Sequence, residues 1–350
     1  MKIPNFLKNK YLLPATLCVV AFVGLAVYYL FAPLSNSEET QYIYIDDDDD
    51  ADSVVVKLSA ISKRQPLKGF TMLARHWGYG KTVHTGCYPI TPGRGALLTF
   101  RRIKKGMQEP INLTIPSVRT VANLSSELSQ RLMLDSAKIH HALSDSTICA
   151  QYGLDTATII CLFIPNTYNV YWDTSVDALL NRMKKEYDAF WNGERNSRAE
   201  SIGMSPTQVM TLASIIDEET AVDAEKPMIA GMYYNRLMLR TGEYPEGMPL
   251  QADPTIKFAL NDFQIRRIYY GQLLVDSPYN TYLHPGLPPG PIRIPSVQAI
   301  DAVLNHVEHD YLYMCAKEDF SGTHNFAATY REHLENARRY SKALNDRGIE

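Results

Sequence analysis

The sequence lacks a strong excess of charge of either sign. Its 350 residues include 35 Lys and Arg against 38 Asp and Glu, a net charge of −3. Nucleic-acid-binding proteins usually carry a marked basic excess, so this balance argues against that class, and no nucleic-acid partner is expected. The basic clusters that do occur, Arg101-Arg102 with Lys104-Lys105 and Arg338-Arg339, are short, and we interpret them as solvated faces.

Closely spaced cysteines are also absent. None of the five forms a Cys-x-x-Cys pair: Cys18, Cys87, Cys149, Cys161 and Cys315. A zinc site is therefore unsupported, and no metal or cofactor is expected. Cys18 lies in an apolar N-terminal run. The other four leave two alternatives open, disulfides in an exported protein or buried, unpaired thiols.

Charged residues are missing from Tyr11 to Ser37, and this gap predicts a membrane span. Its central part, 12–32, has about the 20 apolar residues that a helix needs to cross a bilayer. Lysines precede the run and acidic residues follow it. The positive-inside rule then predicts a cytoplasmic tail at 1–10, a span at 11–32 and an extracytoplasmic remainder.

This pattern predicts a single-pass protein of the inner (cytoplasmic) membrane. A cleaved signal peptide is the alternative, but its apolar region is normally shorter. Here the run is long and ends in the aromatic sequence Tyr28-Tyr29-Leu30-Phe31, which suits a membrane interface. A lipoprotein is disfavoured because Leu17, a large residue, stands before Cys18.

Residues 33–52 are polar and acidic and include five consecutive aspartates, 46–50. Like charges repel one another, so this segment is predicted to be an extended linker. A calcium loop is the alternative, but the segment lacks the spaced oxygen ligands and central glycine of such a loop.

The remaining chain alternates strand and helix signals, which predicts an α+β fold. In an accessory region at 53–155, residues 111–115 alternate like a half-buried strand, apolar residues from Val121 to Leu132 follow at helical spacing, and Asp135 is a candidate N-cap. In a catalytic domain at 156–350, we expect a strand at 159–164, a helix at 176–191 and a loop at 192–200.

The most informative helix begins at Ser205. Ser205 is a candidate N-cap, Pro206 suits the first helical position, and Gln208 would complete a capping box. Successive residues of a helix turn by about 100°, which returns Glu219 to within about 20° of Leu212, inside the apolar stripe. Asp217 and Glu218 point away from that stripe.

An acid on an apolar face is a candidate general acid. Burial disfavours the carboxylate and raises the pKa, and the two neighbouring acids and the helix C-terminus are expected to act in the same direction. A carboxyl group protonated near neutral pH is able to protonate a glycosidic oxygen. The alternative is a buried glutamate satisfied by a structural ion pair or hydrogen bond, which also perturbs pKa values.

Three later segments are rich in turn-forming and sugar-binding residue types. They run over 248–255, 279–292 and 322–326. Their Pro, Gly, Asn and Tyr residues suit rigid, polar and aromatic walls of a sugar site, although ordinary turns use the same residues. His324 in the last segment is interpreted as structural rather than catalytic.

Five of these segments, in this order, resemble the MltG (YceG-like) endolytic murein transglycosylase family. They are Ala213–Ala221, Tyr234–Leu237, Leu250–Thr255, Tyr279–Tyr282 and Gly286–Gly290. The resemblance is strong from about 159 to 340 and weaker over 53–155, where the family carries a small LysM-like α+β module. It also includes the N-terminal anchor.

The resemblance implies cleavage of the bond between N-acetylmuramic acid and N-acetylglucosamine within peptidoglycan glycan strands. The family's catalytic Glu precedes Thr-Ala, which maps the role onto Glu219. The muramic C6 hydroxyl replaces water as the nucleophile and leaves a 1,6-anhydro end. Candidate sugar-binding residues are Gln251, Asp253, Thr255, Asn280, Tyr282 and Asn235. Peptidoglycan synthases in the same membrane are expected partners.

This chain departs from the family at Asp217 and Glu218, where Glu and Lys are common, and at Asn166, where Asp is common. Two other functions stay open on the sequence alone. One is a water-using muramidase, with Asp253 as the second carboxylate. The other is a non-catalytic scaffold that binds the cell wall.

Overall fold

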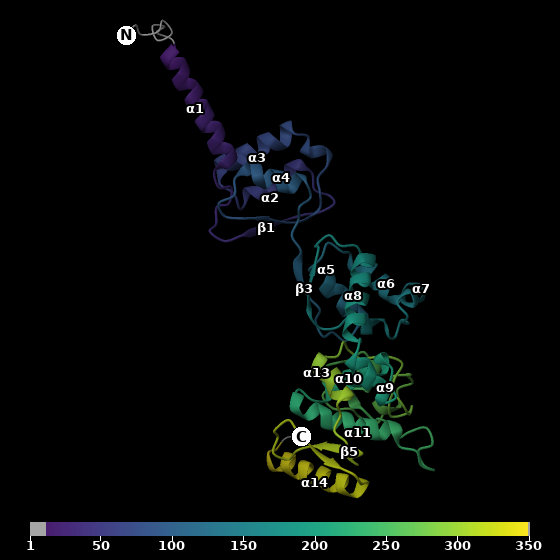
Figure 1. The fold of residues 1–350 in the computed structure, drawn as a ribbon. Helices are drawn as coiled ribbons and strands as arrows, with labels where there is room; N and C mark the ends of the chain where they lie inside the picture. Colours follow the sequence, from purple (N-terminus) through teal and green to yellow (C-terminus); the bar gives the residue numbers. More distant parts are fainter. Residues whose placement is uncertain (1–11, 349–350) are drawn as a thin grey trace. The chain divides into compact units, whose positions relative to one another are not determined.

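The structure is a computed structural model that describes residues 12–348. The chain divides into two compact units (Figure 1). Unit 1 comprises residues up to 113 together with 169–174, and unit 2 comprises 114–168 and 175 onward. The sequence placed a boundary at 155/156 instead, so residues 114–155 belong with the C-terminal unit and not with an accessory region.

Unit 1 combines helices with a small antiparallel sheet. In chain order its elements are α1 (Leu12–Phe31), β1 (Gln41–Ile45), α2 (Ala51–Ser59), α3 (Arg64–His76), the 3₁₀ turn η2 (Tyr79–Lys81), β2 (Gly86–Ile90), α4 (Ala96–Lys104) and β3 (Ile111–Thr114). Strands β1 and β2 pair antiparallel, from Gln41↔Ile90 to Ile45↔Gly86. Their inward side chains join those of α2, α3 and α4 in one apolar core.

Helix α1 is long and apolar enough to cross a membrane, by length and composition. None of its 20 residues is fully buried inside the protein, as expected of a helix whose surroundings are largely lipid. The predicted cytoplasmic tail at 1–10, with the first residue of the predicted span, lies outside the described residues.

The acidic segment is folded, so its prediction as an extended linker was wrong. Part of it forms strand β1, and Asp50 is the N-cap of α2 in a capping box with Ser53. Lys57 of α2 forms ion pairs with Asp46 and Asp49. Capping and pairing offset the repulsion that the run of aspartates would otherwise create.

Unit 2 is mainly helical. Its elements up to the central helix are α5 (Val121–Ser129), α6 (Ser136–Ser144), α7 (Ser146–Gln151), the turn η3 (Ile159–Leu162), β4 (Thr167–Val170), α8 (Val176–Phe190), α9 (Glu194–Ser201) and α10 (Pro206–Glu219). The later elements are η4 (Asp223–Glu225), α11 (Lys226–Met238), α12 (Asp253–Ala259), η5 (Gln272–Leu274), α13 (Val297–Leu304), β5 (Tyr313–Ala316), β6 (His324–Ala327) and α14 (Tyr330–Asp346).

The α+β class is confirmed, as are the predicted strand at 111–115 and the helices at 121, 135, 176 and 205. Two predictions were wrong. The apolar run 159–164 forms a buried 3₁₀ turn, since burial alone does not distinguish a strand from another compact conformation. The polar segment 192–200 forms helix α9, whose Arg195 pairs with Asp301 of α13.

Helix α10 lies at the centre of unit 2, where it packs against α11 and α13 (Figure 1). Eight consecutive residues, Val209–Ile216, are buried. The helix starts with the predicted capping box of Ser205 and Gln208 and the predicted Pro206. It ends at Glu219, so the core of unit 2 fixes where this acid lies.

Candidate active site

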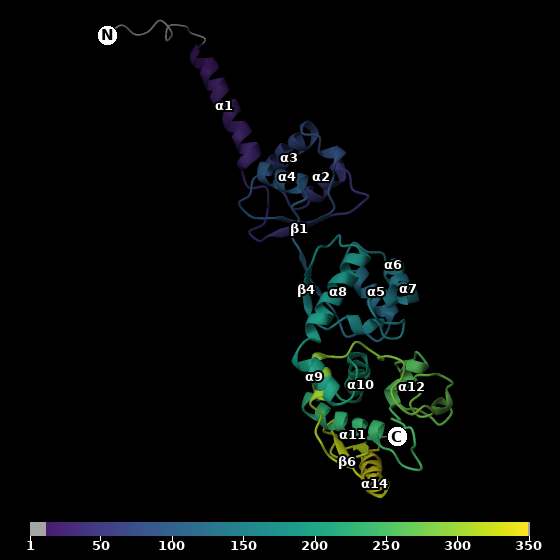
Figure 2. The same cartoon turned by 45° about the vertical axis from the view of Figure 1, so that its right-hand side comes forward.

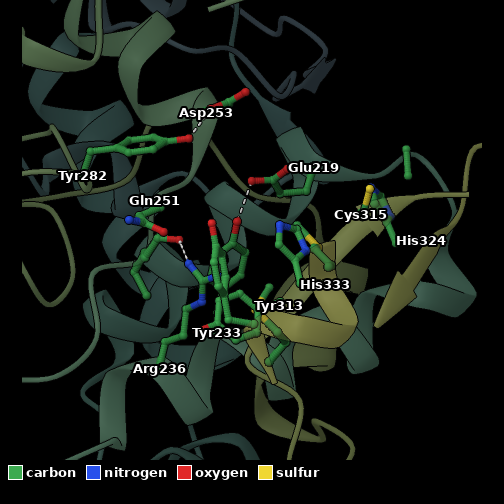
Figure 3. Close-up of a pocket in the computed structure, with 15 residues that line it drawn as sticks. Glu219, Tyr233, Arg236, Gln251, Asp253, Tyr282, Tyr313, Cys315, His324 and His333 are labelled. Atoms are coloured by element: carbon green, nitrogen blue, oxygen red, sulfur yellow. Dashed lines mark hydrogen bonds between the residues drawn. The ribbon is translucent and has the colours of Figure 1, made fainter. Parts of the chain in front are cut away.

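Glu219 lines a cavity of about 330 Å³ in unit 2 (Figure 3). A cavity of this size suits a small-molecule or sugar-unit site. Glu219 comes from the end of α10, and Tyr233 and Arg236 come from α11. Gln251 lies just before α12, and Asp253 is the first residue of α12. The cavity therefore collects polar side chains from three helices around Glu219.

Burial raises the pKa of Glu219 from 4.5 to about 7. The hydrogen bond from Tyr233 opposes this shift, and the charge of Asp253 adds to it. Because the charged form loses hydration in this pocket, a large fraction of Glu219 is protonated near neutral pH. The carboxyl group thus meets the electrostatic requirement for a general acid.

The neighbouring acids do not contribute as expected from the sequence. Asp217 is only 6% exposed and pairs with Lys226 at 2.7 Å. Glu218 accepts hydrogen bonds from Arg119 at 2.8 and 2.9 Å and from Arg293 at 3.0 Å. Asp217 is thus neutralised by one cation and Glu218 by two. The expectation that they raise the Glu219 pKa was wrong, and burial is the main cause.

Tyr233, one of the buried residues of α11, orients the acid. Its hydroxyl donates a hydrogen bond of 2.6 Å to Oε1 of Glu219. Oε2 forms no hydrogen bond with any residue in the described range 12–348. An oxygen that accepts from Tyr233 is the carbonyl oxygen of the neutral acid, so we place the acidic proton on Oε2, free to reach a bound substrate.

Replacing Tyr233 with phenylalanine is expected to raise the Glu219 pKa further, because the lost hydrogen bond stabilises the carboxylate. A hydrogen bond to a charged group is worth about one pKa unit or more, so the alkaline limb of the pH–rate profile should move up by about one pH unit. The control is Tyr234→Phe, whose hydroxyl donates to the Ile202 carbonyl. An unmoved limb in the Tyr233 variant would exclude this role.

Arg236 holds the walls of the cavity together. It is 7% exposed. Its Nε donates to the carbonyl of Leu312 at 2.6 Å, and its Nη1 donates to those of Pro249 and Leu250 at 3.2 and 2.7 Å. The guanidinium thus ties the segment before α12 to the segment before β5. The fork of donors explains why an arginine stands here.

The sequence predicted three residues that the structure brings to the cavity. Gln251, Asp253 and Tyr282 all line it. The Tyr282 hydroxyl donates to Oδ1 of Asp253 at 2.6 Å. Gln251 has a positive φ of 50°, which is uncommon for a residue other than glycine, and its N–H donates to the Thr281 carbonyl at 3.0 Å. Such a backbone geometry is maintained by its surroundings and is frequent at functional sites.

The other three predicted binding residues are not among the residues that line the cavity. Thr255 is buried and bonds to the Ala252 carbonyl and to Thr281. Asn280 is buried and donates to the carbonyls of Leu273 and Val275. Asn235 donates to the carbonyls of His309 and Tyr311. Their polar groups are occupied by the chain itself, so these residues support the loops that form the site.

The remaining wall comes from β5, β6 and α14. It includes Tyr313, Cys315, His324 and His333. His324 pairs through Nδ1 with Glu225 at 2.9 Å, which agrees with its interpretation as structural. His333 packs against the ring of Tyr313, and burial lowers its pKa. Its Nδ1 is buried and has no hydrogen-bond partner within residues 12–348.

Sequence reasoning missed Tyr233, Arg236, Tyr313 and His333 as site residues. One signal was available for the first two. Tyr233 and Arg236 are three residues apart, and so they share a face of α11. No local signal marks Tyr313 or His333, because their place in the cavity depends on how the C-terminal hairpin packs.

One known protein family matches this chain across both units. The YceG-like family model matches residues 43–339. The chain belongs to the YceG-like family. The YceG-like match begins within β1 and ends in α14, so it includes every residue that lines the cavity.

Relatives of this YceG-like chain are named for an enzymatic activity. An endolytic murein transglycosylase of Bacillus subtilis (strain 168) is 33% identical over 175 residues, which are 50% of this chain and 46% of that protein. One of Streptococcus pneumoniae serotype 2 is 26% identical over 277 residues, 71% of this chain and 49% of that protein. The chain thus spans about half the length of the curated relatives it matches.

A solved structure supports the fold. The crystal structure of a yceG-like protein from Listeria monocytogenes matches with a TM-score of 0.54 and 25% sequence identity. The match covers 85% of this chain and 99% of that one.

Proposed function

We propose that this chain is an endolytic lytic transglycosylase that cleaves the bond between N-acetylmuramic acid and N-acetylglucosamine within peptidoglycan strands. The observation that carries the proposal is Glu219, a cavity-lining acid with a pKa of about 7, whose Oε2 has no hydrogen bond to any described residue. The names of the relatives support the same activity.

In the proposed reaction, Oε2 of Glu219 donates its proton to the glycosidic oxygen as the bond to the muramic anomeric carbon breaks. The C6 hydroxyl of the same muramic residue attacks that carbon and closes a 1,6-anhydro ring. The Glu219 carboxylate then takes the proton released by the hydroxyl. No water enters, and the acid returns to its starting state, so one carboxyl group suffices.

Gln251, Asp253 and Tyr282 are proposed to bind the sugars, because they line the cavity beside the acid. The charge of an ionised Asp253 is placed to stabilise the positive charge that develops on the sugar ring. We propose a supporting role for Thr255, Asn280 and Asn235, through the loops that they hold.

The products test this proposal. Full-length protein should release from purified glycan strands fragments that end in 1,6-anhydro-muramic acid, which mass spectrometry identifies as lighter by one water than reducing ends. Fragments from the middle of strands should appear early, since the cleavage is endolytic. Reducing ends in their place would reject the transglycosylase reaction.

A water-using muramidase is the second candidate, and the position of Asp253 is the observation that favours it. Asp253 shares the cavity with Glu219 and its charge raises the Glu219 pKa. Glycoside hydrolases usually use two carboxyl groups at one site. The same product analysis separates the two reactions, and a protein that binds strands without releasing any product would be the scaffold.

We further propose that α1 crosses the inner membrane once and that the catalytic unit lies on the extracytoplasmic side, where nascent strands and their synthases are found. The order β1–α2–α3–β2 supports the interpretation of this part of unit 1 as the LysM-like module. Addition of a protease to intact spheroplasts should degrade both units if this topology holds.

A further inference from the structure

The last turn of α1 is seated directly on unit 1. A Cβ atom on Gly69 of α3 would lie 2.1 Å from the carbonyl oxygen of Tyr29, and one on Gly95 would lie 2.7 Å from that of Leu30. Leu34, soon after the end of α1, is already fully buried. The folded unit therefore begins where the apolar helix ends, without a flexible connection.

The segment packed against this end is basic and contains no acid. Between Ser53 and Gln108 there are 11 Lys and Arg and no Asp or Glu. Lys57 and Arg102 pair with acids that lie outside the segment. Within the described part of the chain, these basic residues form no ion pair: Lys63, Arg64, Lys68, Arg75, Lys81, Arg94, Arg101 and Lys105.

Helices α3 and α4 bring several of these charges to one surface. Both helices pack on α1 and on each other. Figures 1 and 2 show them on the side of unit 1 from which α1 extends, with β1 on the far side. At about 100° per residue, Lys68 and Arg101 point away from the buried faces of their helices. The apolar Met72 and Leu98 are 48% and 52% exposed.

We propose that this surface, formed by Lys68, Met72, Arg94, Leu98 and Arg101, rests on the anionic lipid headgroups of the bilayer that α1 crosses. The proposal rests on the proposed membrane span of α1. Basic side chains bind anionic headgroups, and exposed apolar side chains gain by entering the interface. A soluble polyanion such as a wall polymer would use the charges but would leave Met72 and Leu98 in water.

Folding brings these basic residues close to the end of α1, although they are far from it in the sequence. The first charged residues after the span are acidic, Glu38 and Glu39. The first basic residue of the surface, Lys68, comes 29 residues after Glu39 and lies near the end of the span only because α3 packs on α1. The contact would limit rotation of unit 1 about the end of α1.

Fluorescence quenching in proteoliposomes tests the proposal. Full-length protein with Cys18 and Cys315 replaced by alanine would carry an environment-sensitive fluorophore at Leu98→Cys. The matched control is Tyr42→Cys, on β1, where the native side chain is 49% exposed. With nitroxide lipids in vesicles that contain anionic lipid, the label at position 98 should be quenched at least about twofold more than the label at 42.

The triple variant Lys68→Glu, Arg94→Glu and Arg101→Glu should lose most of that quenching, because each basic side chain strengthens such a contact by roughly fivefold. A control triple variant changes the net charge by the same amount in unit 2 and should keep the quenching. Its substitutions are Lys138→Glu, Arg266→Glu and Arg338→Glu. Equal quenching at positions 98 and 42 would overturn the proposal, as would a triple variant that is quenched normally but retained less on purified cell-wall polymer.

An alkaline wash of the vesicles separates this proposal from the one on which it rests. Protein that stays with the vesicles while neither label is quenched retains its span and lacks the surface contact. Protein released by the wash does not span the bilayer. That result would reject both the membrane span of α1 and the contact with the headgroups. Glycan cleavage, measured separately in detergent, does not depend on either result.

Discussion

Replacing Glu219 with glutamine is expected to lower kcat for glycan cleavage by about a thousandfold, within the range that a general acid contributes. The amide keeps the shape of the side chain and still accepts the hydrogen bond from Tyr233, so strand binding and the fold should persist. Its amide proton is far too weakly acidic to protonate a leaving oxygen. The rate of release of anhydro-ended fragments by full-length protein measures the effect.

The control is Glu218→Gln, which makes the same chemical change one residue earlier on α10. Glu218 lies in a network with Arg119 and Arg293 and is not among the residues that line the cavity. This variant should keep most of its activity and lose some stability, because two arginines are left without their partner. Comparable losses of activity in both variants would show that the effect comes from the fold and not from proton transfer.

The second large effect is on stability and depends on pH. The pKa of Glu219 is about 7 in the folded protein and near 4.5 when the chain is unfolded. The folded state therefore holds the proton more tightly. As the pH rises from about 4.5 through 7, the free energy of unfolding should fall by about 3 kcal/mol relative to a variant without this group.

Glu219→Gln supplies that variant, so the two unfolding curves should diverge as the pH rises, with the glutamine protein the more stable one above neutrality. Trp191, buried in the same core as α10, reports the unfolding of unit 2. Denaturant unfolding of full-length protein in detergent, followed by tryptophan fluorescence at several pH values, measures the difference. A constant difference across the range would mean that burial does not perturb this acid.

The position of the acid was predictable because it depends on local rules. A capping box and a proline set the start of α10, and the helical repeat then fixes which of three adjacent acids faces inward. The structure differs on the cause of the pKa shift. Asp217 is paired with Lys226 at the start of α11, and Glu218 is paired with Arg119 and Arg293 from distant parts of the chain. The pattern of α10 alone reveals none of these pairs.

The rest of the cavity depended on tertiary packing. Residue type pointed equally to Asn280 and Tyr282, yet one holds loop carbonyls and the other lines the cavity. Tyr313 and His333 line the same cavity as Glu219 only because β5 packs on α11 and α14 packs on β5 and β6. The acidic segment 33–52 shows the same limit, since repulsion among its aspartates is offset by Lys57 and by the cap of α2.

The proposed chemistry depends on a Glu219 carboxyl group that is protonated near neutral pH within its pocket. Infrared difference spectra between full-length wild type and Glu219→Gln, recorded as the pH is raised, observe that group directly. We expect a protonated carboxyl band, absent from the glutamine variant, that disappears around the pKa of about 7. Loss of that band near the ordinary value of 4.5 would contradict this expectation.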